Sequence, residues 1–235
     1  MYGGKTFVAI IPARGGSKGI PQKNVSVVGG KPLIQYTIDE AQNSKYLDDF
    51  IVSTDDREIA KIAKECGAKV PFLRPKELAG DKIKTIDVLI HAVQSLSVMG
   101  KKYDYVVLLQ PTQPLRKSMH IDEAIQHIIK KKEQSLVSVN EVNEHPLLMR
   151  SINEKGHLES LLKVNSTVRR QDFLKFFKIN GAIYINKINE NFNQNTSLND
   201  NRLAYVMEKK YDLDIDEPKD LEKFKHLISK ELNTG

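Results

Sequence analysis

The sequence contains little cysteine and no long hydrophobic segment, and each absence excludes a class of protein. Cys66 is the single cysteine among 235 residues, so no disulfide can form within the chain. No run of about 18 apolar residues occurs, so we expect no membrane-spanning helix. The N-terminus has no long apolar segment after a charged start, which argues against a signal peptide. We therefore expect a cytoplasmic protein that makes no use of a membrane.

The charge is only weakly biased. Lysine and arginine number 36, and aspartate and glutamate number 30, which leaves a formal net charge of +6. The lysines are scattered and no basic stripe alternates with aromatic residues, so a nucleic-acid partner is not favoured. The histidines share no spacing with cysteine or carboxylates that suits zinc, and no G-x-S-x-G motif anchors a hydrolase triad. A small anionic ligand needs only a few local cations and fits this composition.

Short buried runs alternate with amphipathic stretches along most of the chain. Strands are predicted at 7–11, 50–54, 103–110, 135–139, 181–186 and 203–208, and helices from 32, over 55–67, 84–96 and 120–131, and from 218. This alternation predicts an α/β fold with a mostly parallel sheet that is covered by helices on both faces. We expect residues 1–235 to form a single domain. Ligands of such sheets bind beyond the carboxyl ends of the strands.

Residues 140–180 break this rhythm. They are rich in asparagine, lysine and glutamate, and they lack strong helical stripes. We interpret them as an inserted arm rather than a further strand–helix unit. The apolar residues of such an arm must be buried somewhere, and a partner subunit is one place.

The loop after the first strand, IIPARGGSKGIPQKN over 10–24, is the first candidate site. It fits neither the Walker motif nor the dinucleotide fingerprint. It nevertheless combines a strand end, three glycines, the cations Arg14, Lys18 and Lys23, and no carboxylate. Backbone N–H groups and cations of this kind suit a polyphosphate. An ordinary glycine-rich surface loop is the alternative that these residues alone leave open.

The segment DLDIDEP is the second candidate. Asp214 and Asp216 are two residues apart, so in an extended segment both carboxylates point to the same side. Converging carboxylate oxygens are how Mg²⁺ is usually held beside a substrate phosphate. Asp216 is equally placed to cap the helix that begins at Pro218, and Asp214 could be a solvated turn residue.

Gln110 ends a predicted strand in LLQPTQPLR, where its amide could contact a base or a sugar. It could as easily bind its own loop. Arg74 and Thr85 are similarly ambiguous when taken alone.

Together these stretches resemble the cytidylyltransferases that activate nine-carbon acidic sugars. These are the CMP-N-acylneuraminate synthetases and their legionaminate and pseudaminate relatives. The matching segments, in chain order, are IIPARGGSKGIPQKN, IVSTDD, LRPKELAGD, LLQPTQPLR, NGAIYIN and DIDEP. The resemblance implies a Rossmann-like three-layer α/β/α fold of the nucleotide-diphospho-sugar transferase type. It also implies that 140–180 form a small dimerisation and sugar-binding arm in a homodimer.

The resemblance also implies roles for individual residues. The nucleotide-binding positions are Arg14, Gly15, Gly16, Ser17, Lys23, Asn24, Arg74, Asp81 and Thr85. Arg14, Lys18 and Lys23 would act in catalysis, and Lys23 would stabilise the leaving pyrophosphate. Asp214 and Asp216 would join the catalytic set by binding Mg²⁺. The sugar-binding positions are Gln110, Tyr184 and Arg170, with Arg170 reaching across from the other subunit.

One stretch departs from the family pattern. Some sialic acid members have HPLK where this chain has HPLLMR, so their carboxylate-binding lysine is replaced by Leu148, and Arg150 is the candidate substitute. Several legionaminate-type members also lack that lysine, which tilts the prediction toward a legionaminate-like sugar. The expected reaction is CTP plus a nine-carbon 2-keto sugar acid, giving the CMP-sugar and pyrophosphate. The alternatives are a nucleotidyltransferase of the same fold for another sugar such as Kdo or pseudaminate, and a non-catalytic nucleotide-sugar binding protein.

Overall fold

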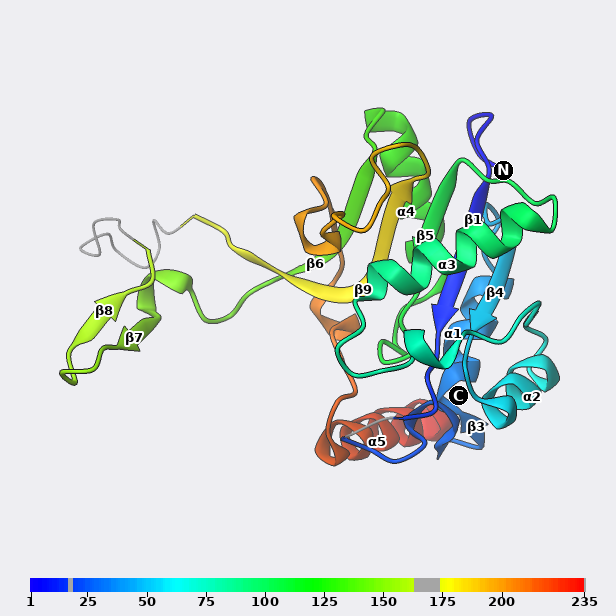
Figure 1. Cartoon of the computed structure of the whole chain (residues 1–235). Helices are drawn as coiled ribbons and strands as arrows, with labels where there is room; N and C mark the ends of the chain where they lie inside the picture. The colour runs from blue at the N-terminus through cyan, green and yellow to red at the C-terminus, as the bar shows by residue number, and fades with distance from the viewer. Residues whose placement is uncertain (17–18, 163–173, 235) are drawn as a thin grey trace.

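A six-stranded sheet forms the centre of the molecule (Figure 1). The computed structural model describes residues 1–16, 19–162 and 174–234. In spatial order the strands are β10 (Leu203–Val206), β6 (Ser135–Glu141), β9 (Phe177–Lys187), β5 (Tyr105–Leu108), β1 (Phe7–Pro12) and β4 (Asp49–Ser53). β9 runs antiparallel to its neighbours β5 and β6, while the other paired strands are parallel. The predicted mostly parallel sheet is confirmed.

Helices cover both faces of this sheet. One face carries α1 (Leu33–Gln42), α2 (Arg57–Glu65) and α4 (Ser118–Lys131), and the other carries α3 (Thr85–Val98). The residues of β1 alternate between these two hydrophobic clusters, which explains why the strand reads as an unbroken apolar run. The predicted three-layer arrangement is thereby confirmed.

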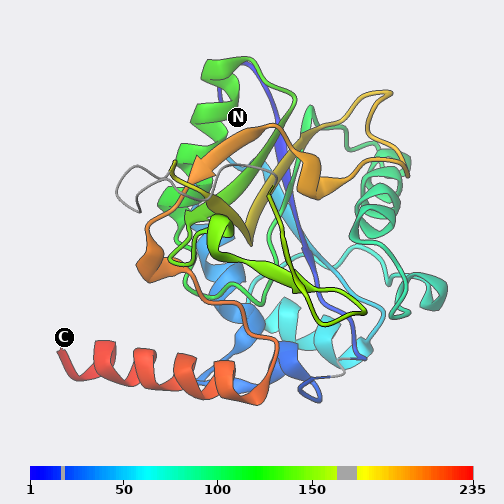
Figure 2. The ribbon, with the colours of Figure 1, turned by 90° about the vertical axis from the view of Figure 1, so that its left-hand side faces the viewer.

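The carboxyl ends of β1 and β4 point toward the last helix, α5 (Pro218–Thr234) (Figures 1 and 2). Near α5 lies a small hairpin of β2 (Val27–Val28) and β3 (Lys31–Pro32). A third hydrophobic cluster includes Leu33 of α1, Phe224 of α5 and Ile215 of the preceding segment. This cluster fixes the 213–216 segment against the body, next to the loop that follows β1.

Two adjacent aspartates, Asp55 and Asp56, precede α2 and have different partners. The Asp56 carboxylate accepts hydrogen bonds from the N–H groups of Glu58 and Ile59, so Asp56 is the N-cap of α2. Asp55 accepts instead from the N–H of Gly15, at 3.2 Å. Asp56 therefore caps α2, whereas Asp55 binds the loop after β1.

The strands that lead into and out of the arm are longer than composition suggests. β6 continues to Glu141, and β9 begins at Phe177, four residues before the predicted strand. Asn140 and Asn180 are polar yet buried, because their side chains hydrogen-bond to one another. Buried polar residues of this kind give no hydrophobic signal, and so the sheet extends into the range 140–180.

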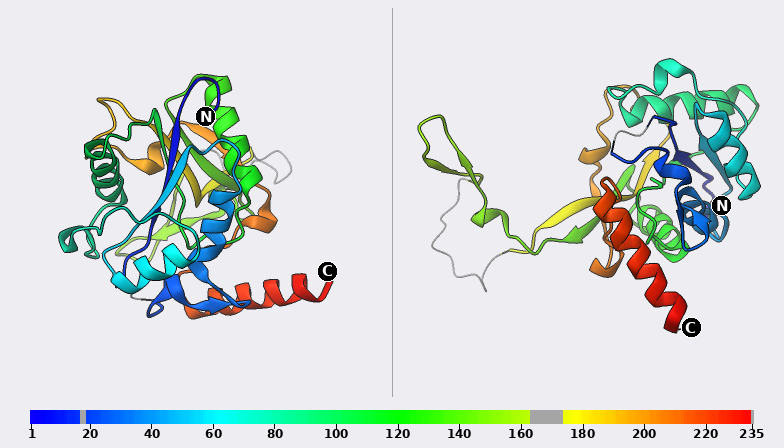
Figure 3. Two further views of the ribbon diagram at one scale, coloured as in Figure 1. Left: turned by 90° about the vertical axis from the view of Figure 1, so that its right-hand side faces the viewer. Right: turned by 90° about the horizontal axis from the view of Figure 1, so that it is seen from below.

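Beyond these strands the chain forms an arm that projects from the body (Figures 1 and 3). It contains the short hairpin of β7 (Arg150–Ile152) and β8 (Leu158–Ser160), all of whose residues are exposed. Over the three described ranges, no helix is long and apolar enough to cross a membrane.

Candidate active site

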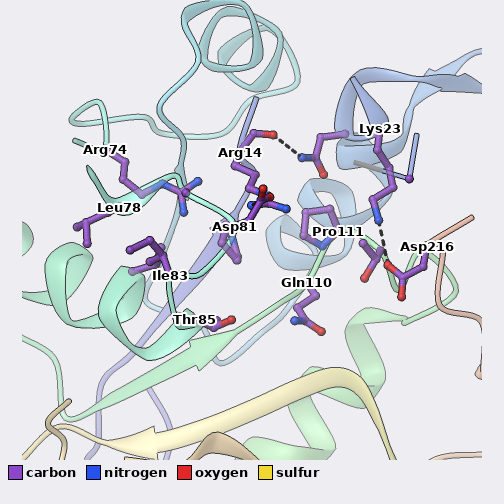
Figure 4. Close-up of a pocket in the computed structure, with 16 residues that line it drawn as sticks. Arg14, Lys23, Arg74, Leu78, Asp81, Ile83, Thr85, Gln110, Pro111 and Asp216 are labelled. Atoms are coloured by element: carbon purple, nitrogen blue, oxygen red, sulfur yellow. Dashed lines mark hydrogen bonds and ion pairs between the residues drawn. The ribbon is translucent and has the colours of Figure 1, made fainter. Parts of the chain in front are cut away.

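A cavity of about 430 Å³ opens beyond the carboxyl ends of β1 and β5 (Figure 4). Four parts of the chain bound it: the loop after β1, the loop after β5, residues 74–88, and the segment that contains Asp216. Its lining includes Arg14, Gly19, Lys23, Asn24, Arg74, Asp81, Thr85, Gln110, Thr112 and Asp216. The position agrees with the rule for ligands of parallel sheets. Eight of the sequence-predicted nucleotide, sugar and metal positions therefore meet at one place: Arg14, Lys23, Asn24, Arg74, Asp81, Thr85, Gln110 and Asp216.

Arg14 lies on one wall of this cavity. Its Nη1 is 2.8 Å from Oδ1 of Asp81, and both side chains are partly exposed. The backbone carbonyl of Arg14 accepts a hydrogen bond from Nδ2 of the buried Asn24, at 3.2 Å. The start of the loop is thus held in place while the guanidinium reaches the cavity. The pair with Asp81 also draws the 76–84 segment toward the same opening (Figure 4).

Arg74 is a buried cation whose side chain has hydrogen-bond donors without partners among the described residues. It is 5% exposed, and within the described ranges its Nε and Nη2 have no hydrogen-bond partner. Its nearest carboxylate is Oδ1 of Asp55, 3.7 Å from Nη2. Burial lowers the pKa of Arg74, the charge of Asp55 raises it, and Arg14 lowers it further. Buried donors usually have partners, so this side chain suits a polar or anionic ligand in the cavity.

Lys23 and Asp216 form the opposite wall. The Lys23 ammonium lies 3.1 Å from Oδ1 of Asp216 and donates to the carbonyl of Ile215 at 2.7 Å. The N–H of Ile215 donates to the carbonyl of Thr112, at 2.9 Å. The 213–216 segment is therefore fixed between the loop after β1 and the loop after β5.

Gly19 makes the closest approach between these parts. A Cβ atom placed on Gly19 would lie only 2.3 Å from the backbone oxygen of Asp216. Because that oxygen is part of the main chain, it cannot rotate away as a side chain would. Only glycine allows the loop and the aspartate segment to lie this close together.

Asp214 and Asp216 lie on the same side of an extended segment, as their spacing predicts. Leu213 and Ile215 are buried, whereas both aspartates are exposed. The carboxylate of Asp216 has Lys23 as its partner, and the backbone N–H groups of Asp216 and Glu217 donate to Asp220.

The charge around Asp214 is suited to a divalent cation. Desolvation raises the pKa of Asp214, and the nearby charges of Asp216 and Asp220 raise it further. A hydrogen bond with Thr112 and the charge of Lys23 act in the opposite direction. Across the described residues no group of three or more metal-ligating side chains occurs. A metal on this pair would therefore take its other ligands from phosphate oxygens and water, as Mg²⁺ commonly does.

Gln110 connects this cavity to two others. It also lines cavities of about 590 Å³ and about 330 Å³, and Tyr184 of β9 lines both of these. Asp214 lines the smaller one. Burial raises the pKa of Tyr184, and the charge of Asp214 adds to the effect, so the hydroxyl stays protonated at neutral pH and can donate a hydrogen bond.

Other predicted positions lie elsewhere. Arg150 is on β7 of the arm, where its Nη1 donates to the carbonyls of Leu147 and Met149. It is not among the residues that line the three cavities, so a single chain does not bring it to them. Ser17, Lys18 and Arg170 fall outside the described residues. Gly15 and Gly16 are not among the residues that line the main cavity, and the N–H of Gly15 donates to Asp55.

Sequence reasoning missed Gly19, Thr112 and Arg116 as parts of the site. Gly19 and Thr112 line the main cavity, and Arg116 is buried behind it. The two loops that contain them were recognised as candidate sites. No local signal distinguishes these positions from their neighbours, because each acts on a segment far away in the sequence.

The sheet, the strand-end cavity and its cations define a nucleotide-binding α/β protein of the nucleotidyltransferase type. A CMP:2-keto-3-deoxy-manno-octonic acid synthetase in complex with CTP matches 96% of this chain and 99% of its own, with a TM-score of 0.72 and 18% identity. A 4-diphosphocytidyl-2C-methyl-D-erythritol synthase matches 95% of this chain and 98% of its own, with a TM-score of 0.69 and 13% identity. At these identities the likeness concerns the fold.

The family model for cytidylyltransferases matches residues 8–234, and the chain belongs to this family. It is 37% identical to an N-acylneuraminate cytidylyltransferase of Streptococcus agalactiae serotype III, over 94% of this chain and 52% of the relative. It is 38% identical to a CMP-N,N'-diacetyllegionaminic acid synthase of Legionella pneumophila, over 76% of this chain and 77% of the relative.

A pseudaminic acid cytidylyltransferase of Campylobacter jejuni is 33% identical, over 92% of this chain and 93% of the relative. The chain thus spans about half the length of the streptococcal relative and nearly all of the Campylobacter one. The family predicted from the sequence motifs is confirmed.

Proposed function

We propose that this chain transfers a cytidylyl group from CTP to a nonulosonic acid and releases pyrophosphate. The relatives named above carry out activations of this type according to their names. One observation carries the proposal: a single strand-end cavity brings together Arg14, Lys23, Arg74 and the carboxylate of Asp216. Among the described residues, Nε and Nη2 of Arg74 have no hydrogen-bond partner.

The phosphate end of the site lies between Arg14 and Lys23. The anomeric hydroxyl of the sugar attacks the α-phosphorus in line, and the bond from the α-phosphorus to the pyrophosphate oxygen breaks. Negative charge then accumulates on the leaving pyrophosphate. Arg14, Lys18 and Lys23 offset that charge, so the protein contributes mainly positioning and electrostatic stabilisation.

The nucleoside end lies toward Arg74 and Thr85. Arg74 supplies the free N–H donors of a buried guanidinium. Thr85 is the first residue of α3, whose N-cap residue Lys84 makes no side-chain capping bond. The N–H groups of a helix's first turn and a threonine hydroxyl are donors that suit the oxygen atoms of cytidine. We propose that Asn24 and Asp81 also contact the nucleotide.

Asp214 and Asp216 would hold Mg²⁺. When bound, the ion would neutralise phosphate charge and act as a Lewis acid on the attacking hydroxyl. Lys23 already balances part of the charge of this pair, at 3.1 Å from Asp216. We propose that Lys23 exchanges this contact for the leaving phosphates when CTP binds.

The sugar end is formed by Gln110 and Tyr184 around the two further cavities. We propose that Arg170, and Arg150 in place of a lysine at Leu148, act on the sugar of the partner subunit in a homodimer. Leu148 favours a legionaminate-type acid. We propose that the enzyme works in the cytoplasm, where its single cysteine stays reduced.

A nucleotide panel tests the first part of this proposal. With Mg²⁺ present, CTP should raise the melting temperature more than UTP, ATP or GTP do. Arg14→Ala should lose most of this shift, and pyrophosphate release from CTP should fall by orders of magnitude. Arg57→Ala, an exposed arginine at the start of α2, is the matched control and should behave as wild type. A CTP shift no larger than that of the other nucleotides would contradict the cytidylyl assignment.

A further inference from the structure

Arg116 is a fully buried arginine that no step of the proposed mechanism uses. It is 1% exposed, and in the described part of the chain it forms no ion pair with a carboxylate. Burial lowers its pKa to about 9, with the charge of Glu40 acting in the opposite direction. An arginine in such a position is costly unless its donors are well used. Within the described ranges its Nε has no hydrogen-bond partner, so the two terminal nitrogens make all of its side-chain hydrogen bonds.

The guanidinium joins three separate parts of the fold. Its Nη1 donates to the carbonyl of Ala182 at 2.8 Å and to the carbonyl of Gln110 at 3.3 Å. Its Nη2 donates to Oγ1 of Thr37 in α1, at 2.8 Å. Arg116 therefore links the end of β5, the middle of β9 and a helix of the opposite layer.

Gln110 and β9 meet closely at this link. Gly181 precedes Ala182 and has a φ of +76°, and a Cβ atom placed on it would lie 2.7 Å from Oε1 of Gln110. The side-chain amide of Gln110 thus packs against bare backbone. A small shift of either segment would change where the amide points, at the junction of the three cavities.

The β9 side of this link is held by its own network. The pairing of β6 and β9 shifts register between Val137 and Val139. At that shift Oδ1 of Asn180 accepts from Oγ of Ser138 at 2.6 Å and from the N–H of Ala182 at 3.0 Å. Satisfied buried networks of this kind are rigid. Ala182 is therefore held in place, and Arg116, which binds the carbonyls of both Ala182 and Gln110, holds the backbone of Gln110 relative to β9.

We infer that Arg116 is a positioning residue that acts through Gln110 to orient its amide toward the sugar acid. The inference deepens the proposed function and rests on it. Arg116 itself touches neither substrate. A lysine at 116 would keep the charge, but it lacks the planar fork that binds two carbonyls and a hydroxyl together.

A double-mutant cycle tests this, with Arg116→Lys, Gln110→Ala and the combined variant measured for kcat/KM toward sialic and legionaminic acids. Arg116→Lys should raise the sugar KM about tenfold, the size of one lost charge-assisted hydrogen bond, and change the CTP KM less than about twofold. The combined variant should be no worse than Gln110→Ala alone, because the two changes remove the same contact.

If the losses in kcat/KM of the two single variants multiply in the combined variant, Arg116 has a structural role and the inference is overturned. Equal increases in the sugar KM and the CTP KM of Arg116→Lys would overturn it as well. If Arg116→Lys does not fold, Thr37→Val replaces it in the cycle, since it removes one anchor of the guanidinium and nearly preserves volume. Gln110→Ala with an unchanged sugar KM would also overturn the inference, while leaving CTP-dependent turnover intact. A wild-type chain that releases no pyrophosphate with any acid would instead overturn the proposed function, and the inference with it.

Discussion

The body and the arm of this molecule differ in what holds them together. In β1 every residue except Pro12 is fully buried, whereas every residue of β7 and β8 is exposed. Ile152 and Leu158 face one another across the hairpin and are 71% and 69% exposed. The main cavity is thus built on a packed core, while the arm carries apolar side chains that no described residue covers.

This difference indicates how the two halves of the site are completed. A two-stranded hairpin is marginally stable in water without further packing. A second copy of the chain, as proposed above, would cover the arm and bring Arg150 and Arg170 to a sugar. The body should therefore bind CTP without help from the arm, and changes in the arm should affect chiefly the binding of the sugar acid. The predictions below test that division.

The largest effect is expected in the body at Gly19. Gly19→Ala places a Cβ atom 2.3 Å from the backbone oxygen of Asp216, so the loop and the aspartate segment must separate. A displacement of this size between catalytic groups should lower kcat by on the order of 100-fold. Steady-state kinetics with CTP and a sugar acid measure it.

Gly4→Ala is the control for general destabilisation. Gly4 has a φ of +71°, and a Cβ atom placed on it would have no other atom within 4 Å, so the change adds strain without a clash at the site. It should cost about 1 kcal/mol of stability and leave kcat unchanged. If both variants lose the same activity, the Gly19 contact has no special role.

Arg74→Met should separate ligand binding from stability. The change removes a buried charge whose Nε and Nη2 donate to no described group, so the ligand-free protein should melt at the same temperature or higher. CTP affinity should fall by about 10- to 100-fold, because hydrogen bonds to a charged donor are lost. Calorimetric titration with CTP and a melting curve give both quantities. A large drop in melting temperature with unchanged affinity would make Arg74 a structural residue.

The arm is tested by placing a charge on its apolar face. Leu158→Asp should weaken self-association and raise the sugar KM about tenfold, with CTP affinity unchanged, because a carboxylate is costly to bury in an interface. Ser151→Lys is the matched control, since Ser151 lies on the other face of the hairpin, opposite Glu159. Sedimentation velocity measures the self-association, and steady-state kinetics measure the sugar KM. A dimer that survives Leu158→Asp would place the interface elsewhere.

The smallest effect concerns pH at Asp214. Its pKa is raised by desolvation and by Asp216, so it takes up a proton at a higher pH than an ordinary aspartate. Protonated Asp214 cannot bind Mg²⁺, and Mg²⁺ affinity should therefore fall as the pH drops through that raised pKa. The metal-free protein should show the opposite trend, because ionisation of a group with a raised folded-state pKa removes stability as the pH rises.

Asp214→Asn provides the comparison. Relative to the variant, the metal-free wild type should lose melting temperature as the pH rises from the ordinary aspartate pKa through the raised folded-state pKa, and the difference should be absent below the unfolded pKa. An identical pH dependence for the two proteins would show that Asp214 is not perturbed in solution.

Much of the fold and the position of the site could be predicted from local sequence. The layers followed from the spacing of apolar residues, and the strand-end position of Arg14, Lys23 and Gln110 followed from the motifs that precede each loop. The pairing of Arg14 with Asp81 could not be predicted, because it joins residues far apart in sequence. The same holds for Gly19 against Asp216 and for Arg116 against Ala182. Local patterns indicate which loops matter, whereas tertiary packing decides which atoms meet.

The most direct test of the central claim is pyrophosphate release from CTP, measured side by side with legionaminic, sialic, pseudaminic and Kdo acids. We predict Mg²⁺-dependent release with the nine-carbon acids, with legionaminic acid turned over fastest and Kdo slowest. Preferential turnover of Kdo, or no release from CTP with any of the four acids, would contradict the account.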